Sequence, residues 1–143
     1  MSQSTVTQRL DVPTSMPGGA QYRQLAYVEA YDAVLNAPYA FLAYRETDSD
    51  GSWRVRVRSS MTAGGEFDPA AMANNARAAC AQGKPWFQWG YSFDPSAGDP
   101  RCIQFRVHVA DNQPKAIEIF VQLRRADGSA DAPVSTVFPW PSA

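Results

Sequence analysis

The single histidine, His108, is the residue best suited to acid–base chemistry in this 143-residue chain. An imidazole held by a carboxylate can act as a general base, and Glu118 and Asp111 would lie beside it in a hairpin. The sequence contains no second histidine and no Gly-x-Ser-x-Gly nucleophile motif. A histidine opposite a glutamate is also an ordinary cross-strand pair. We therefore predict no catalytic residue, and we expect His108→Ala to leave any activity intact.

An acidic run in the first half of the chain resembles the start of a calcium-binding loop. Glu46, Asp48, Asp50 and Gly51 have the required spacing, but the twelfth position is Val57 instead of a bidentate glutamate. Aspartate and glycine in a hairpin turn explain the same residues. Zinc spacing, a phosphate-binding glycine loop and a dinucleotide fingerprint are also missing from the sequence. We predict no metal site and no cofactor.

Basic side chains alternate along the predicted strands of two hairpins. If the two hairpins share one sheet, these side chains form a basic strip with Phe120 in its midst, which is one way to hold single-stranded nucleic acid. The strip consists of Arg54, Arg56, Arg58, Arg106, His108 and Arg124. The net charge is −1 and Glu118 lies on the same face, so a solvated sheet face explains the pattern more simply. Nucleic acid is therefore a disfavoured partner.

Aromatic residues are the most suggestive feature of the sequence. They crowd one predicted strand at Trp86, Phe87, Trp89, Tyr91 and Phe93. Large rings mostly build the core of a small domain, but a strand has two faces, so Trp86 points away from Trp89. Trp86 is therefore predicted to line a pocket or a subunit interface. The proline-flanked Trp140 near the end of the chain is a further anchor for a partner.

The first hairpin is predicted from residues 39–46 and 52–60. The turn-forming residues 48–51 lie between these two alternating segments. A four-residue loop would pair Tyr44 with Val55 and place both side chains on the core face.

The second hairpin is predicted over residues 102–125, where apolar and polar positions alternate on both arms. Centring the turn on Gln113 makes every pair on one face apolar, so the register is strongly specified. The pairs are Val109 with Ile117, Val107 with Ile119, Phe105 with Val121, and Ile103 with Leu123. A short edge strand at residues 134–138 is also expected.

Two helices complete the expected elements. Residues 21–36 carry apolar residues at helical spacing, although alternation from Leu25 also fits a strand, so this choice stays open. Residues 70–82 are rich in alanine, follow Asp68-Pro69 and precede Gly83, which are typical start and stop signals.

This order of elements predicts an α+β fold. We expect an antiparallel sheet of five to six strands, including the two hairpins, with one or two helices packed on one face. If residues 21–36 form a strand, a β-sandwich is the better alternative. Residues 1–20 are expected to be a flexible tail and residues 21–143 a single domain.

The composition excludes several classes of protein. Charged residues make up 19% of the chain and hydrophobic residues 45%, as in ordinary globular domains. No apolar run approaches the roughly 20 residues that span a bilayer, and a secretory signal is not apparent, so a cytoplasmic location without membrane contact is expected. Cys80 and Cys102 are isolated, and the sequence leaves open whether they are bonded.

We therefore predict a non-enzymatic binding or assembly protein. It would form a homo-oligomer, or engage a protein or small-molecule partner, through aromatic surface that includes Trp86, Trp89, Tyr91 and Trp140. One alternative is a small-ligand enzyme with a cavity between helix and sheet, using His108, Glu118 or Asp94. The other is a nucleic-acid-binding module that uses Arg54, Arg56, Arg106 and His108.

Overall fold

The chain folds into two antiparallel β-sheets, and the computed structural model describes residues 5–9, 18–60, 72–74, 86–92 and 95–141. The first sheet has the order β1-β2-β3-β4-β5 and the second the order β6-β7-β8-β9. The strands of the first sheet are β1 (Thr5–Arg9), β2 (Tyr22–Asp32), β3 (Ala37–Thr47), β4 (Trp53–Ser60) and β5 (Met72–Asn74). Those of the second are β6 (Trp86–Ser92), β7 (Cys102–Ala110), β8 (Gln113–Gln122) and β9 (Val134–Pro139), with a 3-10 turn at Pro95–Ala97.

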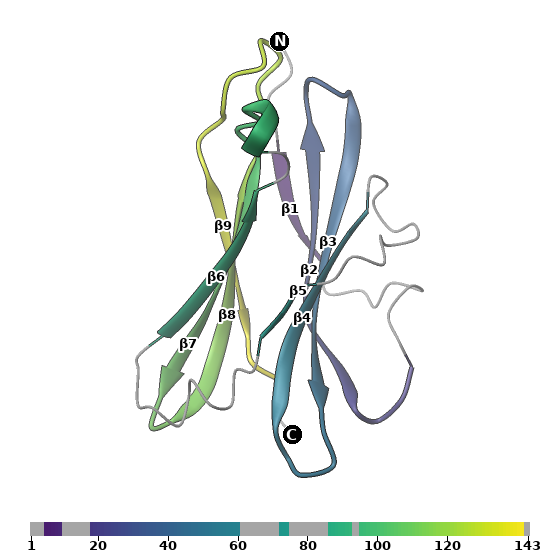
Figure 1. Ribbon diagram of the computed structural model, residues 1–143, viewed down its shortest axis with the longest axis vertical. Helices are drawn as coiled ribbons and strands as arrows, with labels where there is room; N and C mark the ends of the chain where they lie inside the picture. The colour runs from purple at the N-terminus through teal and green to yellow at the C-terminus, as the bar shows by residue number, and fades with distance from the viewer. Residues whose placement is uncertain (1–4, 10–17, 61–71, 75–85, 93–94, 142–143) are drawn as a thin grey trace.

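The two sheets face each other, and one hydrophobic core fills the space between them (Figure 1). Val28, Phe41 and Val55 enter this core from the first sheet, and Phe105 and Ile119 enter it from the second. All five side chains are almost completely buried. Burial of one face of each sheet against the other is the main source of stability in such a sandwich.

The α+β prediction is wrong, because the described residues contain no α-helix. Residues 21–36 were expected to be helical, but Tyr22–Asp32 forms β2. This strand pairs with β1 on one side and β3 on the other. Hydrogen bonding along both edges, which is invisible in the local sequence, outweighs its weak helical periodicity. The resulting pair of facing sheets has the architecture of the β-sandwich alternative.

The alanine-rich helix expected at residues 70–82 is contradicted where the structure describes it. Met72–Asn74 is strand β5, which pairs with Val55–Val57 of β4. The rest of that segment lies outside the described residues. Thr5–Arg9, within the stretch expected to be a tail, pairs with β2 as β1. No helix in the described part of the chain is long and apolar enough to cross a membrane.

The β3–β4 hairpin forms where it was predicted, but its register is shifted by one residue. Thr47 pairs with Trp53, so the loop contains five residues instead of four. The Asp48 amide donates to the Ser52 carbonyl at 2.7 Å, which draws Ser52 into the loop. Ala43 is consequently opposite Val57.

This one-residue shift changes the face on which part of β3 lies. Phe41 and Ala43 belong to the core between the sheets. Tyr44, which was expected there, lies with Leu42 in a second buried cluster that also contains Tyr27. Because successive side chains of a strand point to opposite faces, a single extra loop residue exchanges the two sets.

The β7–β8 hairpin has the predicted apolar face but a register shifted by two residues. Phe105 pairs with Ile119 because the turn is made by Asp111 and Asn112 alone. Both turn residues have positive φ, 53° and 60°, as a two-residue type I′ turn requires. A bulge near Lys115 then brings the apolar residues back to the core face. An even shift preserves the face of every side chain, so the predicted core positions are confirmed.

Candidate functional site

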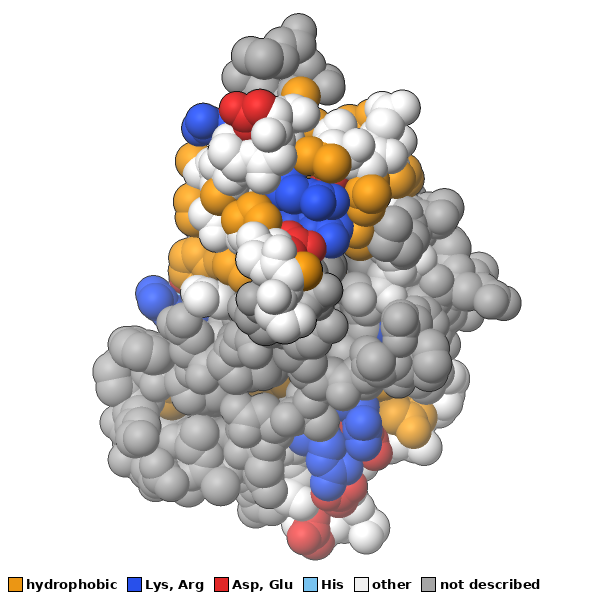
Figure 2. Space-filling view, turned by 45° about the horizontal axis from the view of Figure 1, so that its top comes forward, with side chains coloured by type: hydrophobic (Ala, Val, Ile, Leu, Met, Phe, Trp, Pro, Cys, Tyr) orange, Lys and Arg blue, Asp and Glu red, His pale blue; other side chains and the backbone are white. Residues whose placement is uncertain are grey.

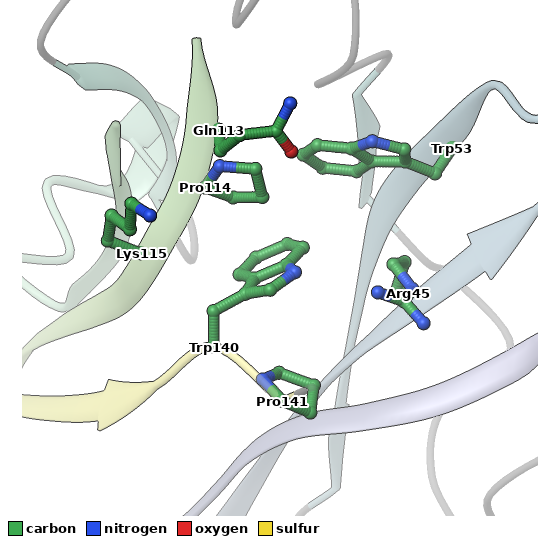
Figure 3. A pocket seen from close by; sticks show the side chains of 7 residues that line it. All are labelled: Arg45, Trp53, Gln113, Pro114, Lys115, Trp140 and Pro141. Atoms are coloured by element: carbon green, nitrogen blue, oxygen red, sulfur yellow. The ribbon is translucent and has the colours of Figure 1, made fainter. Parts of the chain in front are cut away.

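An open pocket of about 430 Å³ lies where the first sheet, β8 and the end of β9 meet (Figure 3). Its volume falls in the range of small-molecule sites. The lining consists of Arg45, Trp53, Gln113, Pro114, Lys115, Trp140 and Pro141. These residues come from segments far apart in the sequence, so the pocket exists only in the folded chain.

Two tryptophans form the apolar wall of this pocket. Trp53 begins β4 and Trp140 directly follows β9. Their ring centroids are 5.0 Å apart and their planes are tilted by 52°, within the range of favourable aromatic pairs. Both side chains are only partly buried and pack against the central core. They therefore offer ring surface to a ligand while being held from behind.

The backbone positions both tryptophans. Trp53 is the residue paired with Thr47 across the β3–β4 hairpin, so the five-residue loop determines its place. The Trp140 amide donates a hydrogen bond to the Lys115 carbonyl at 3.0 Å. Lys115 lies in the bulge at the start of β8, and this bond fastens the end of β9 beside it. The five-residue β3–β4 loop and the bulge at the start of β8 thus both position residues of this pocket.

Arg45 is the cation beside the two indole rings (Figure 3). It lies on the core-facing side of β3, opposite Val55 of β4 and Arg23 of β2. Burial, and then the positive charge of Arg23, lower the pKa of Arg45 from its usual value. Its Nε is buried and has no hydrogen-bond partner within the described residues. Arg45 therefore carries a charge that the described structure leaves uncompensated.

The polar side chains of the described lining include two cations and one amide. This described lining contains no Asp, Glu, His, Cys or Ser, and Lys115 is the side chain there of a type that can act as a general base or nucleophile. Lys115 lines the pocket too, but its side chain extends away from the indole rings (Figure 3). Gln113 reaches towards Trp53 and supplies an amide. The lining therefore combines ring surface, one amide and one facing cation.

A second group of polar side chains joins the two sheets elsewhere in the sandwich. Asp32 at the end of β2 is fully buried, and Arg124 and Arg101 approach its carboxylate to 3.2 and 3.7 Å. Arg101 also pairs with Asp99 at 2.6 Å. Figure 2 shows basic side chains framed by hydrophobic ones near the top of the molecule, with acidic atoms beside them. The charges of this cluster balance, so we assign it to the joining of the sheets.

Tyr39 completes this cluster. Arg101 donates a hydrogen bond to its hydroxyl and lies 5.3 Å from the centre of its ring. Burial raises the pKa of Tyr39, and the nearby Arg101 only partly opposes this effect. The hydrogen bonds from Arg101 lower the pKa of Asp99. A phenol that resists ionisation and a satisfied ion pair are features of a structural contact.

The structure separates the basic residues that were expected to form one strip. Arg54 and Arg56 lie on β4 in the first sheet, whereas Arg106 and His108 lie on β7 in the second. The strip depended on a shared sheet, and that condition is not met. Arg54 and Arg56 are also neutralised by ion pairs, because both contact Glu46.

His108 and Arg106 contact the residues expected beside them, although by a different register. His108 Nε2 lies 2.9 Å from Glu118 Oε1, and Arg106 lies 5.1 Å from the centre of the Phe120 ring. Both contacts are diagonal, since Arg106 is the residue opposite Glu118. They occur on the outer face of the second sheet, where the His108 side chain is 39% exposed.

The acidic run at the β3–β4 turn has a local structural role. Asp48 pairs with Arg54 at 2.7 Å, and Asp50 accepts a hydrogen bond from the Ser52 amide at 2.9 Å. Among the described residues, no group of three side chains is arranged to hold a metal ion.

The predicted aromatic residues are divided between β6 and the pocket. Trp86, Trp89 and Tyr91 lie on β6, whose backbone register places Trp89 opposite Phe105. Trp140 lines the pocket, whereas the side chains of Trp86, Trp89 and Tyr91 lie outside the described part of the structure. Trp53 was expected on the core face of its strand, and Arg45 was not singled out. A charged residue at a core-facing position of β3 could have indicated Arg45 as a functional residue. The predicted register was wrong by one residue and placed Tyr44 opposite Val55 instead of Arg45.

Comparison of the chain with protein-family models, with curated proteins and with solved structures finds no match.

Proposed function

We propose that this protein is a non-enzymatic binding module that takes a small-molecule ligand in the pocket at Trp53 and Trp140. One observation carries the proposal: two partly exposed indole rings and an uncompensated arginine line the same cavity. Aromatic walls with a few placed polar groups are typical of ligand sites. The described lining contains no Asp, Glu, His, Cys or Ser, and its lysine, Lys115, extends away from the indole rings, which favours binding over catalysis.

The test is a ligand-observed NMR screen with a library of neutral, anionic and cationic fragments. We expect hits whose affinity falls by about tenfold or more in Trp140→Ala, because that exchange removes one wall of the pocket. Phe120→Ala is the matched control, since it removes an aromatic ring from the outer face of the second sheet. The proposal is wrong if no fragment binds, or if Trp140→Ala and Phe120→Ala bind every hit as the unaltered protein does.

A second candidate function, self-association, is favoured by strand β9. This strand is at the edge of its sheet, and Val134 and Val137 are 41% and 52% exposed. Edge strands with apolar side chains readily pair with another chain. Light scattering should then report a homo-oligomer that Val137→Lys dissociates and Ala132→Lys does not. A monomer at all accessible concentrations would exclude this candidate.

We further propose a cytoplasmic location. The free thiol of Cys102 supports it, because isolated reduced thiols are typical of reducing compartments. Cell fractionation with an antibody against the protein provides the test, and recovery outside the cytosolic fraction would refute the proposal.

A further inference from the structure

The charged side chains in the described lining of the pocket are all positive. The described lining contains two cations, Arg45 and Lys115, and no carboxylate. Arg23 stands opposite Arg45 in the neighbouring strand and adds a further positive charge. The chain as a whole has a net charge of −1, so this concentration is local. A positive potential in a partly enclosed cavity attracts anions.

Arg45 has a buried hydrogen-bond donor without a described partner. A guanidinium can donate five hydrogen bonds, and burial of an unsatisfied donor is unfavourable. Arg45 has an unpartnered buried Nε, and burial and Arg23 both disfavour its charged form. A negatively charged ligand group would relieve both effects at once. Arg54, Arg101 and Arg124 each form an ion pair with a carboxylate. Within the described residues, Arg45 has no such carboxylate partner.

The tryptophans specify the rest of the ligand. Trp53 and Trp140 present ring surface next to the Arg45 guanidinium (Figure 3). A planar apolar body placed against these rings would bring an attached anionic group to Arg45. Because Lys115 extends away from the rings, Arg45 is the one cation of the described lining that faces the ligand.

Resting on the proposed function, we propose that the pocket selects small aromatic carboxylates. The planar fork of an arginine matches the two oxygens of a carboxylate, and one facing cation suits one negative charge. A neutral sugar would find the stacking surface but would leave Arg45 without an ionic partner. Selection is therefore expected from charge, and affinity from both the rings and Arg45.

The experiment compares phenylacetate with phenylacetamide, which share a shape and differ in charge. Ligand-observed NMR titration should give a Kd for phenylacetate that is about tenfold lower or more. Arg45→Met, which keeps the length of the side chain without its charge, should reduce this preference to about twofold or less. Arg106→Met is the matched control and should retain the preference, because it removes an arginine from the outer face of the second sheet, outside the described lining of the pocket.

The other possible results of this experiment also test the proposed selection of carboxylates. Equal binding of the two probes, or an unchanged preference in Arg45→Met, overturns the inference. If both probes bind equally and both depend on Trp140, the proposed pocket stands and only the carboxylate selection fails. Tighter competition by inorganic phosphate or by methyl glucoside overturns the assignment of the ligand class. If Arg45→Met does not fold, the preference of the unaltered protein must fall as salt rises from about 50 to about 500 mM.

Discussion

Asp32 and Arg124 form a two-pronged contact between the sheets. Arg124 Nε lies 3.2 Å from one carboxylate oxygen of Asp32, and Nη2 lies 3.3 Å from the other. Asp32 ends β2 in the first sheet, and Arg124 follows β8 in the second. The same carboxylate accepts a hydrogen bond from the Leu35 amide at 2.9 Å, which also holds the β2–β3 turn.

We expect Asp32→Ala to lower the free energy of unfolding by about 3 kcal/mol, because it leaves Arg124 and Arg101 as poorly solvated cations without their shared partner. Urea unfolding measures the change. Arg54→Ala is the control, since a partly exposed ion pair contributes about 1 kcal/mol or less. Equal effects of the two exchanges would show that the Asp32 cluster does not join the sheets.

The pKa of Asp99 predicts a loss of stability in acid. Its pKa is lowered in the folded protein by hydrogen bonds from Arg101, so the folded state binds this proton less readily than the unfolded state. The stabilisation is therefore present above the unfolded pKa of about 4 and is lost as the pH falls through the folded value. Asp99→Asn should unfold with a smaller difference in urea midpoint between pH 7 and about pH 3.

The control for this prediction is Asp111→Asn, which alters an exposed carboxylate in a turn. It should preserve the pH dependence of the unaltered protein. An Asp99→Asn profile that overlays the original one would refute the role given to Asp99.

The Asp111–Asn112 turn should be sensitive to the conformational preferences of its residues. Asn112 has a φ of 60°, where a β-branched side chain is strongly disfavoured. We expect Asn112→Val to destabilise the protein by about 1–2 kcal/mol, and Asn112→Gly to be neutral or stabilising. Thermal or urea unfolding provides the measurement. The same order of stabilities would not arise if the turn adopted the register centred on Gln113.

Cys102 should react slowly in the folded protein. Burial raises the pKa of its thiol, and Sγ lies 3.5 Å from the Gln122 side-chain oxygen. Because the thiolate is the reactive form, we expect Cys102 at pH 8 to react with a disulfide reagent about tenfold or more slowly than the same residue in urea. The variant Cys80→Ser isolates this thiol. Equal rates with and without urea would contradict the prediction.

Prediction from the sequence succeeded where one strand face is uniformly apolar. The alternation in residues 102–125 correctly predicted that Phe105, Val107, Ile117 and Ile119 face the core, despite the wrong turn. It failed for residues 21–36, because the helical spacing of a few apolar residues competed with an alternation that only sheet partners could reinforce.

Local sequence patterns could not predict the pocket. The sequence places Trp53 on a core-facing strand position and marks Trp140 by its flanking prolines, but neither pattern points to the other tryptophan or to Arg45. Only the five-residue loop places Arg45 and Ala43 on the same side as Trp53. A shift of one residue in that loop would have turned the cation away from the rings.

By itself, the sequence determined that this chain forms hairpins with alternating faces, because side-chain alternation is a local property of an extended backbone. Tertiary structure alone decided that the hairpins lie in different sheets, that β2 is a strand, and that Arg45 meets Trp53 and Trp140. These outcomes depend on loop length, strand partners and packing between the sheets. Each of these long-range contributions to the folding free energy is small, and their sum cannot be predicted from any short segment of the sequence.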